Sequence, residues 1–307
     1  MATTSTPDRD VPSSDQYHEI ITTTVATSTT TTNVYETDAS LHMYYGLHYP
    51  ESGNVVENIP SIIPHDHAPI HGLNFQQRVA QLLHRLMKSQ PEPPQYRNAL
   101  DIGCAVGGAS FELAKFFDHV DGFDYSSSFI QAAKHMQTQP ETVRFRVPIE
   151  ADIYQEVQAV HSIGVTESIR SKVTFSTGDA CHMESMVKDG QLRTDYNGII
   201  MSNLLCRLPD PIACLDGLSN LIQRNGLVVI VTPYSWLTEY TERENWLGGH
   251  IDHHSNEAIY SKNTLQKLME SRGFIKIHEE QIPLIIREHQ RKYQYIVSEA
   301  TGWKKGS

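Results

Sequence analysis

Short apolar runs alternate with helical segments through most of the chain, and this alternation restricts the possible folds more than any other feature. Apolar runs of the kind found in buried strands lie at 99–102, 120–123, 173–175, 199–202 and 227–232. Between them, apolar residues recur at helical spacing in 109–117, 126–138 and 211–223. Strands that alternate with helices form βαβ units, in which the strands pair in parallel. The sequence therefore predicts a doubly wound α/β fold.

Two more strands are expected near the carboxyl end, at 274–280 and 293–298, after a helix at 263–271. The link between them, IPLIIREHQRK, is too short for a crossover helix, so the last strand is expected to run antiparallel. The predicted sheet thus has seven strands and is mostly parallel. The stretch 143–172 interrupts the alternation, and we interpret it as an insertion that contains a helix at 150–161.

The region before the alternation divides into two parts. Residues 1–33 are rich in Thr and Ser and lack a periodic apolar face, which predicts a disordered tail. Residues 34–307 are expected to form a single domain. It begins with NVYETDASLHMYYGLHYP, which is dense in Tyr and His, and passes through a loop to an amphipathic helix within 73–89.

The composition excludes several classes of partner. Among 307 residues, 25 Lys and Arg stand against 36 Asp and Glu, a net charge of −11, which argues against nucleic acid or an anionic membrane surface as the main partner. No apolar run approaches the roughly 18 residues of a membrane span, and no secretory signal is evident. The four cysteines form no C-x-x-C pair, which is typical of a protein of the reducing cytoplasm.

The segment ALDIGCAVGGAS runs from a predicted strand into a turn and then a helix. Doubly wound folds bind nucleotides at such a junction. Gly103 and Gly107 lack a Cβ atom where the backbone has to turn tightly and approach a ligand. The dinucleotide pattern G-x-G-x-x-G is broken, because Ala105 occupies its middle position. The pattern present is D-x-G-x-x-x-G, which begins at Asp101.

Acids also end the next two predicted strands. Asp124 ends VDGFD, where a carboxylate can accept from both hydroxyls of a ribose, or can instead cap the helix that follows. Asp179 ends FSTGDA, where it can accept from an adenine amino group while Ala180 donates from its backbone. Acids at three strand ends fit an adenosyl ligand that has no pyrophosphate.

Together these features resemble the cofactor site of class I methyltransferases, which use S-adenosylmethionine. The resemblance implies their Rossmann-like fold. An enzyme that binds a nicotinamide dinucleotide requires all three glycines of G-x-G-x-x-G and a helix end that faces the pyrophosphate. The resemblance places Asn203 beside the sulfonium of the cofactor; the alternative is that Asn203 is an ordinary turn residue. It also pairs Arg78 with the methionine carboxylate of the cofactor; the alternative is that the Arg78 side chain lies in solvent. The expected cofactor-binding set is Arg78, Asp101, Gly103, Cys104, Ala105, Gly107, Asp124, Tyr125, Asp179, Ala180 and Asn203.

Five longer segments resemble one family more closely, the methyltransferase domain of ovothiol biosynthesis. They are NVYETDASLHMYYGLHYP, ALDIGCAVGGASFELA, NLLCRLPDP, TPYSWLTEYTERENWLGG and PLIIREHQRKYQYIVSEATGW. The resemblance runs from Asn33 to Trp303 and implies N-methylation of the imidazole ring of a mercaptohistidine. In that family the domain is often fused behind a sulfoxide synthase, so a separate synthase is the expected pathway partner here. The alternatives are another small acceptor (histidine, a histidine dipeptide, a selenol-imidazole or a phenol) and a non-catalytic cofactor-binding subunit.

The resemblance also suggests which residues hold such an acceptor. Segments 34–72 and 231–249 are expected to wall its pocket. Arg287 is expected on the link between the last two strands and is the first candidate to bind the carboxylate of the acceptor; the alternative is a surface ion pair. Arg207 is the second candidate. Glu36 would receive the ammonium group. The aromatic residues that would contact the imidazole, unless they are core residues, are Tyr35, Tyr45, His48, Tyr234, Trp246 and Tyr293.

The histidines raise the questions of a general base and of a metal. A neutral imidazole acceptor already presents a ring lone pair, so deprotonation is optional. If a base is used, the candidates are Tyr45, His48 and His250. The histidine clusters lie in loops without cysteine partners, and methyl transfer needs no Lewis acid, so no metal is expected. The clusters are His65, His67 and His71, and His250, His253 and His254.

Overall fold

The computed structural model describes residues 34–49, 70–91 and 96–306, and the chain from Val34 onward forms one compact unit. The predicted tail at 1–33, together with His65 and His67, lies outside the described residues.

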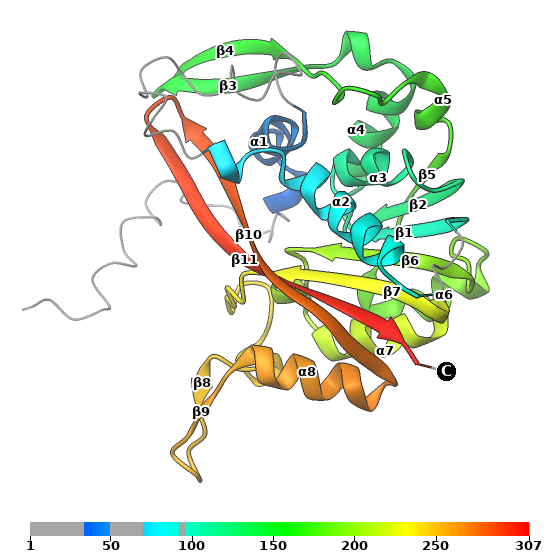
Figure 1. Cartoon of the computed structure of the whole chain (residues 1–307). Helices are drawn as coiled ribbons and strands as arrows, with labels where there is room; N and C mark the ends of the chain where they lie inside the picture. Colours follow the sequence, from blue (N-terminus) through cyan, green and yellow to red (C-terminus); the bar gives the residue numbers. More distant parts are fainter. Residues whose placement is uncertain (1–33, 50–69, 92–95, 307) are drawn as a thin grey trace, which may run out of the picture. The chain divides into compact units, whose positions relative to one another are not determined.

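The strands of the main sheet are β1 (Asn98–Ile102), β2 (His119–Asp124), β5 (Val173–Thr177), β6 (Tyr196–Ser202), β7 (Ile222–Thr232), β10 (Phe274–His289) and β11 (Lys292–Lys305). They form one seven-stranded sheet in the order β10-β11-β7-β6-β1-β2-β5 (Figure 1). The first five pair in parallel, whereas β11 runs antiparallel to both β7 and β10. The predicted fold, with a mostly parallel sheet and an antiparallel last strand, is confirmed.

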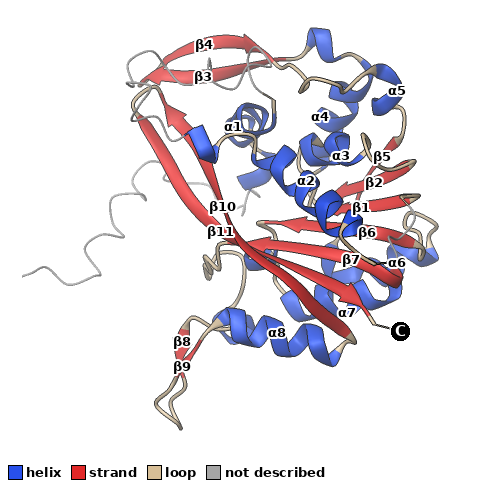
Figure 2. Cartoon of the chain, viewed as in Figure 1, coloured by secondary structure: helices blue, strands red, loops and turns tan. Residues whose placement is uncertain are grey.

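Helices cover both faces of the sheet (Figure 2). Because consecutive strand residues point to opposite faces, Ile200 and Val229 belong to one apolar core while their neighbours Ile199 and Val228 belong to the other. The first core includes α2 (Phe75–Lys88), α3 (Gly108–Leu113) and α4 (Ser127–Thr138). The second includes α6 (Met183–Lys188), α7 (Pro211–Leu221) and α8 (Ser261–Ser271).

The insertion differs from the prediction. Residues 150–161 were expected to be helical, but the chain forms a hairpin there, from β3 (Arg144–Glu150) and β4 (Ile153–Gln158), before the short helix α5 (Glu167–Arg170). In β3, Phe145 and Val147 are buried while their neighbours Arg144 and Arg146 are exposed. This alternation is the pattern of a strand with one covered face, so the predicted helix was wrong.

The last two strands are longer than predicted. They pair from Phe274 and Lys305 to His289 and Lys292, so most of the expected link is strand and Arg287 lies on β10. Only residues 299–304 of β11 pair with β7, so the rest of this hairpin extends beyond the sheet. There β10 contacts β3 and the N-terminal helix α1 (Asp38–His48), which Thr37 caps (Figure 1). The insertion, α1 and the β10–β11 hairpin therefore meet.

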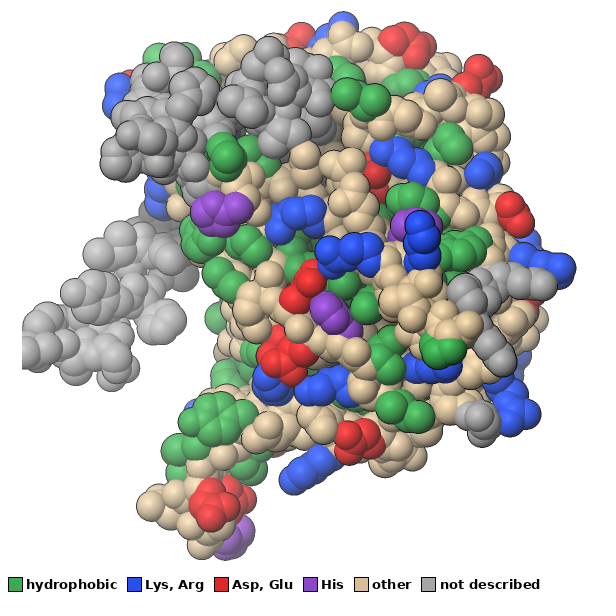
Figure 3. All heavy atoms as spheres, in the orientation of Figure 1, with side chains coloured by type: hydrophobic (Ala, Val, Ile, Leu, Met, Phe, Trp, Pro, Cys, Tyr) green, Lys and Arg blue, Asp and Glu red, His purple; other side chains and the backbone are tan. Residues whose placement is uncertain are grey.

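One face of the molecule carries charges of both signs (Figure 3). The side of the molecule in Figure 3 carries Lys and Arg side chains interspersed with Asp and Glu. Among the described helices, none has the length and apolar character needed to cross a membrane.

Candidate active site

The glycine loop makes a tight turn between β1 and α3. Gly103 and Gly107 have φ angles of +73° and +88°, and Ala105 also has a positive φ of 47°. A Cβ atom on Gly107 would lie 2.7 Å from the ring of Phe175, so only glycine fits that position without a shift of the ring. The N–H groups of Gly103 and Cys104 both donate to the carbonyl of Phe123, which ties the loop to β2.

Asp124 lies at the end of β2 beside this loop. Its Oδ2 atom accepts the N–H of Ala105 at 2.9 Å, and its Oδ1 atom accepts the N–H of Ser126 at 2.9 Å. Burial raises the pKa of the carboxyl group to about 6, although both backbone hydrogen bonds lower it. The side chain is half-buried. A carboxylate held against a glycine loop in this way can still accept from ribose hydroxyls, so the site fits an adenosyl group.

The other two acids have partners within the protein. Asp101 is buried, its Oδ2 accepts the hydroxyl of Ser110 at 2.6 Å, and burial raises its pKa to about 7. It therefore holds the start of α3 and does not face a ligand directly. Asp179 caps the 3-10 helix η6 (Ala180–His182) by accepting the N–H of Cys181 at 2.8 Å.

Three further predicted cofactor residues are placed as follows. Arg78 donates to the carbonyls of Leu73 and Pro283, so it joins α2 to β10. Because both contacts are structural, they do not support its predicted contact with the methionine carboxylate. Asn203 has a φ of 53° at the end of β6 and accepts the hydroxyl of Ser298 at 2.8 Å. Tyr125 is 67% exposed beside Asp124.

One face of α1, with the segment before it, lies over Asp124. The centre of the Tyr44 ring lies 4.6 Å from that of Phe129. Burial raises the pKa of Tyr44, and the nearby negative charge of Asp124 raises it further. Tyr35 lies in the 3-10 helix η2 (Val34–Glu36), with its ring 5.9 Å from that of Tyr240.

Two polar residues anchor this tyrosine-rich face. The Arg207 guanidinium lies 4.9 Å from the centre of the Tyr240 ring and donates to the carbonyl of Ser235 at 2.6 Å. The predicted role of Glu36 is not supported. Its carboxylate accepts the N–H groups of Ser127 and Ser128 at 2.9 and 3.3 Å, and therefore caps α4, where the helix dipole favours negative charge.

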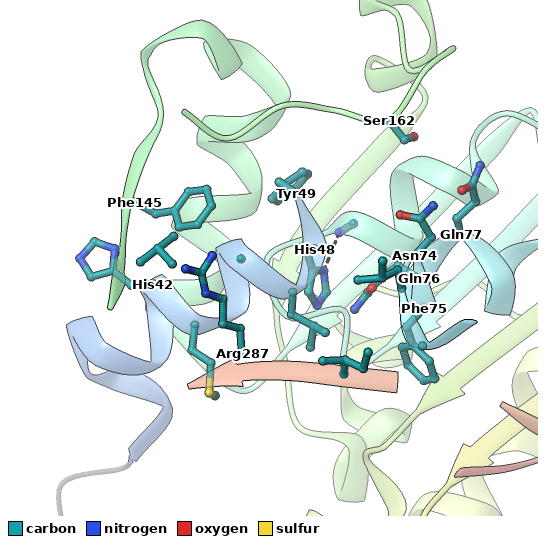
Figure 4. Close-up of a pocket in the computed structure, with 18 of the residues that line it drawn as sticks. His42, His48, Tyr49, Asn74, Phe75, Gln76, Gln77, Phe145, Ser162 and Arg287 are labelled. Atoms are coloured by element: carbon teal, nitrogen blue, oxygen red, sulfur yellow. Dashed lines mark hydrogen bonds between the residues drawn. The ribbon is translucent and has the colours of Figure 1, made fainter. Parts of the chain in front are cut away.

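The other face of α1 borders a cavity of about 620 Å³ (Figure 4). Its walls come from α1, the start of α2, α3, the β3–β4 hairpin and β10. His48, Arg287 and Tyr293 line it, so three of the predicted acceptor residues come together. Tyr45 does not line it, because its ring packs on Phe145, 6.1 Å away, and burial raises its pKa to about 12.

His48 is held by the glycine-rich turn. Its Nδ1 atom accepts the N–H of Gly108 at 3.1 Å, and burial lowers its pKa to about 3. The imidazole is therefore neutral at physiological pH, and the lone pair of Nδ1 is already engaged. This arrangement does not suit the predicted role of a general base.

The remaining predicted acceptor residues do not line this cavity. The Tyr234 hydroxyl donates to Glu299 at 2.6 Å, and the Trp246 Nε1–H donates to the carbonyl of Thr241 at 2.8 Å. Trp246 stacks on Trp236 with the ring centres 6.5 Å apart. His250 lies on β8 (His250–Ile251), which pairs with β9 (Ala258–Ile259) in a separate small hairpin. These residues build the segment 231–251 itself rather than the cavity wall.

The sequence alone missed several residues of the site. Tyr44 and Tyr240 were not selected, although Tyr44 lies over Asp124 while its neighbour Tyr45 turns away. Gln76 lines the cavity and is only 8% exposed. It shares the buried face of α2 with Val79 and Ala80, so a polar residue within an apolar stripe was the available signal.

The histidines give no metal centre in the part of the chain that is described, where no three His, Cys, Asp or Glu side chains gather suitably. His71 instead hydrogen-bonds the Tyr295 hydroxyl at 2.7 Å.

Comparison with solved structures gives distant likenesses. A methyltransferase from Methanosarcina mazei is 17% identical over 69% of this chain and 94% of its own, with a TM-score of 0.43. Magnesium protoporphyrin IX methyltransferase from Synechocystis, solved with bound SAH, is 17% identical over 75% and 83%, with a TM-score of 0.42. The methyltransferase domain of bacterial CtHen1-C is 15% identical over 76% and 100%, with a TM-score of 0.45. No curated protein matches the chain.

These TM-scores are too low to show which family the chain belongs to. A match to a family of sequences shows it instead. The model of a methyltransferase domain family matches residues 72–279, a range that holds the glycine loop, Asp124 and the five parallel strands. Because this range is more than half of the chain, the protein belongs to the methyltransferase domain family, and S-adenosylmethionine is its methyl donor.

Proposed function

We propose that this methyltransferase methylates an imidazole ring nitrogen of a thiol-bearing histidine, of the mercaptohistidine type made in ovothiol biosynthesis. The observation that carries the proposal is the cavity of about 620 Å³ bordered by α1, whose sequence resembles that family. Small-molecule sites are typically concave, mostly apolar and equipped with a few polar groups. This cavity has that character and lies against the turn that begins α3.

The charged groups of the cavity suit an amino acid. Arg287 on β10 offers a guanidinium that can bind a carboxylate through two parallel hydrogen bonds. Asp38 and Glu288 also line the cavity. Asp38 supplies negative charge for an ammonium group, whereas Glu288 is already paired with Lys292 at 2.6 Å. In this proposal the role first expected of Glu36 passes to Asp38. Apolar side chains such as Phe145 and Ile285 exclude water around the ring.

S-adenosylmethionine supplies an electrophilic methyl group when bound. A neutral imidazole already offers a ring lone pair, so the chain has to orient and desolvate the acceptor rather than remove a proton first. The protonation states of the site agree with this requirement. His48 is neutral, and its Nδ1 lone pair is engaged by the N–H of Gly108.

The proposal has two consequences for the cellular setting. A reaction that attaches sulfur to histidine has to supply the acceptor, so we propose a separate sulfoxide synthase upstream. We also propose a cytoplasmic location, because all four cysteines are free thiols in the structure.

The experiment that tests the proposal is turnover with labelled S-adenosylmethionine across mercaptohistidine, histidine, carnosine, ergothioneine and tyramine. We expect methylated mercaptohistidine as the preferred product, identified by mass spectrometry. Turnover on another acceptor with none on mercaptohistidine would reject the proposed acceptor, and turnover on none would favour a non-catalytic subunit.

A further inference from the structure

Gln76 is a largely buried polar side chain whose carboxamide faces the cavity without a protein partner among the described residues. It is 8% exposed and lies on the apolar stripe of α2 with Val79, Ala80 and Leu83. Within the described ranges its carboxamide makes no hydrogen bond, yet it lines the cavity. A carboxamide that opens onto a cavity without a protein partner is satisfied there by water or by a bound molecule. The unmade hydrogen bonds of Gln76 therefore point to a ligand.

Asn74 repeats this feature two residues earlier. It occupies the N-cap position of α2, where an Asn side chain usually accepts a backbone N–H from the first turn. Here it makes no such bond, its backbone has a φ of 54°, and it lines the cavity. The carboxamide is thus available to a ligand instead of the helix.

His48 adds a hydrogen-bond donor of fixed identity. Because its Nδ1 atom accepts the N–H of Gly108, the neutral ring has to carry its proton on Nε2. In the described part of the chain this N–H has no acceptor, and His48 lines the cavity. Figure 4 shows Asn74 and Gln76 on one side of the cavity, Arg287 on the other and His48 between them.

We propose that His48, Asn74 and Gln76, here called the polar wall, recognise the uncharged heteroaromatic ring of the acceptor, with Gln76 as the main specificity-determining residue. The inference rests on the proposed function and deepens it. A carboxamide both donates and accepts, and the His48 Nε2–H only donates. The wall therefore matches a ring that carries one N–H donor and one further acceptor atom, such as the sulfur or the second nitrogen of a mercaptoimidazole.

The wall also excludes other substrates. A phenyl ring offers neither group and would leave all three polar side chains unpaired, and a site built to hydrogen-bond its ligand discriminates strongly against such analogues. The acceptor class is therefore an amino acid or short peptide that bears a neutral imidazole or mercaptoimidazole.

The test compares Gln76→Leu with Gln81→Leu, the same change at an exposed position of α2. Binding of mercaptohistidine and of phenylalanine is measured by calorimetry on protein saturated with S-adenosylhomocysteine. We expect Gln76→Leu to weaken mercaptohistidine binding roughly 10- to 100-fold and to strengthen phenylalanine binding, because the phenyl ring no longer leaves Gln76 unpaired. We expect Gln81→Leu to change neither affinity. We also expect the Tm of Gln76→Leu not to fall, because the carboxamide holds no partner within the described part of the fold. A purely structural role would lower it.

Binding and turnover separate the two proposals. Unchanged mercaptohistidine affinity in Gln76→Leu, or equal loss for phenylalanine, overturns the polar wall. If the wild-type protein binds mercaptohistidine through Gln76 but does not methylate it, the wall stands and the proposed reaction fails. If Gln76→Leu does not fold, Gln76→Glu, which keeps the shape and one acceptor oxygen, is measured in its place. An affinity equal to that of the wild type would then overturn the inference.

Discussion

The carboxylate of Asp124 accepts the N–H of Ala105 at 2.9 Å, and so joins the end of β2 to the middle of the glycine loop. One side chain thereby shapes the loop and faces the expected ribose position. We predict that Asp124→Asn weakens binding of S-adenosylhomocysteine roughly 10- to 100-fold, because the new amide cannot accept at both oxygens. Calorimetry with Asp118→Asn, an exposed acid just before β2, gives the control. Equal affinities of Asp124→Asn and the wild type would show that the ribose lies elsewhere.

The pKa of Asp124, raised to about 6, predicts a pH dependence of cofactor binding. Hydroxyl groups donate to the carboxylate form, so binding favours that form and lowers the pKa in the complex. Below about pH 6 the free protein holds a proton that binding has to displace, and the affinity should fall by up to about tenfold per pH unit. Titrations from pH 5 to 8 should show a decline only at the acid end, and Asp124→Asn should lack it. A flat profile in the wild type contradicts this prediction.

Arg287 is predicted to bind the acceptor and not the cofactor. Arg287→Ala should raise the KM for the acceptor roughly 10- to 100-fold, which corresponds to the loss of a charge-assisted hydrogen bond, and should leave S-adenosylhomocysteine binding unchanged. Arg291→Ala is the matched control, because Arg291 is exposed at the turn of the same hairpin. Steady-state kinetics and calorimetry check both parts. A change in cofactor affinity, or loss of folding, would assign Arg287 a structural role.

The sequence was sufficient for the five parallel strands because each of them is a local apolar run close to a helix. It was not sufficient where two structures fit one pattern. Residues 150–161 read as a helix, but packing of Phe145 against Tyr45 covers one face of the hairpin, and that contact joins distant parts of the chain.

The site divides in the same way. The positions of Gly103, Gly107 and Asp124 follow from a strand that runs into a turn, so the motif locates them directly. The partners of Glu36 and Arg78 depend on tertiary contacts with α4 and β10, which no local pattern contains. For the same reason only some of the predicted acceptor residues line the cavity. Tyr44 and Tyr45 are neighbours in sequence, yet their rings pack on Phe129 and Phe145, because consecutive residues of a helix point about 100° apart.

Asp101 is predicted to lower the stability of the protein at neutral and alkaline pH. It is 2% exposed, and burial raises its pKa to about 7, well above the usual value for an aspartate. Below about pH 4 the carboxyl group is protonated in both the folded and the unfolded protein and contributes no difference. Between about pH 4 and pH 7 only the unfolded state loses the proton, so the folded state becomes less favoured as the pH rises, and the loss levels off above pH 7.

Asp101→Asn should remove this loss while keeping an oxygen that accepts the hydroxyl of Ser110. We expect the variant to be more stable than the wild type by about 1–2 kcal/mol at pH 8 and equally stable at pH 4. Urea unfolding at both pH values measures the difference, with Asp189→Asn at an exposed position as the control. Lower stability of Asp101→Asn at pH 8 would mean that the charged carboxylate, through Ser110 and α3, holds the glycine loop more strongly than its burial opposes it.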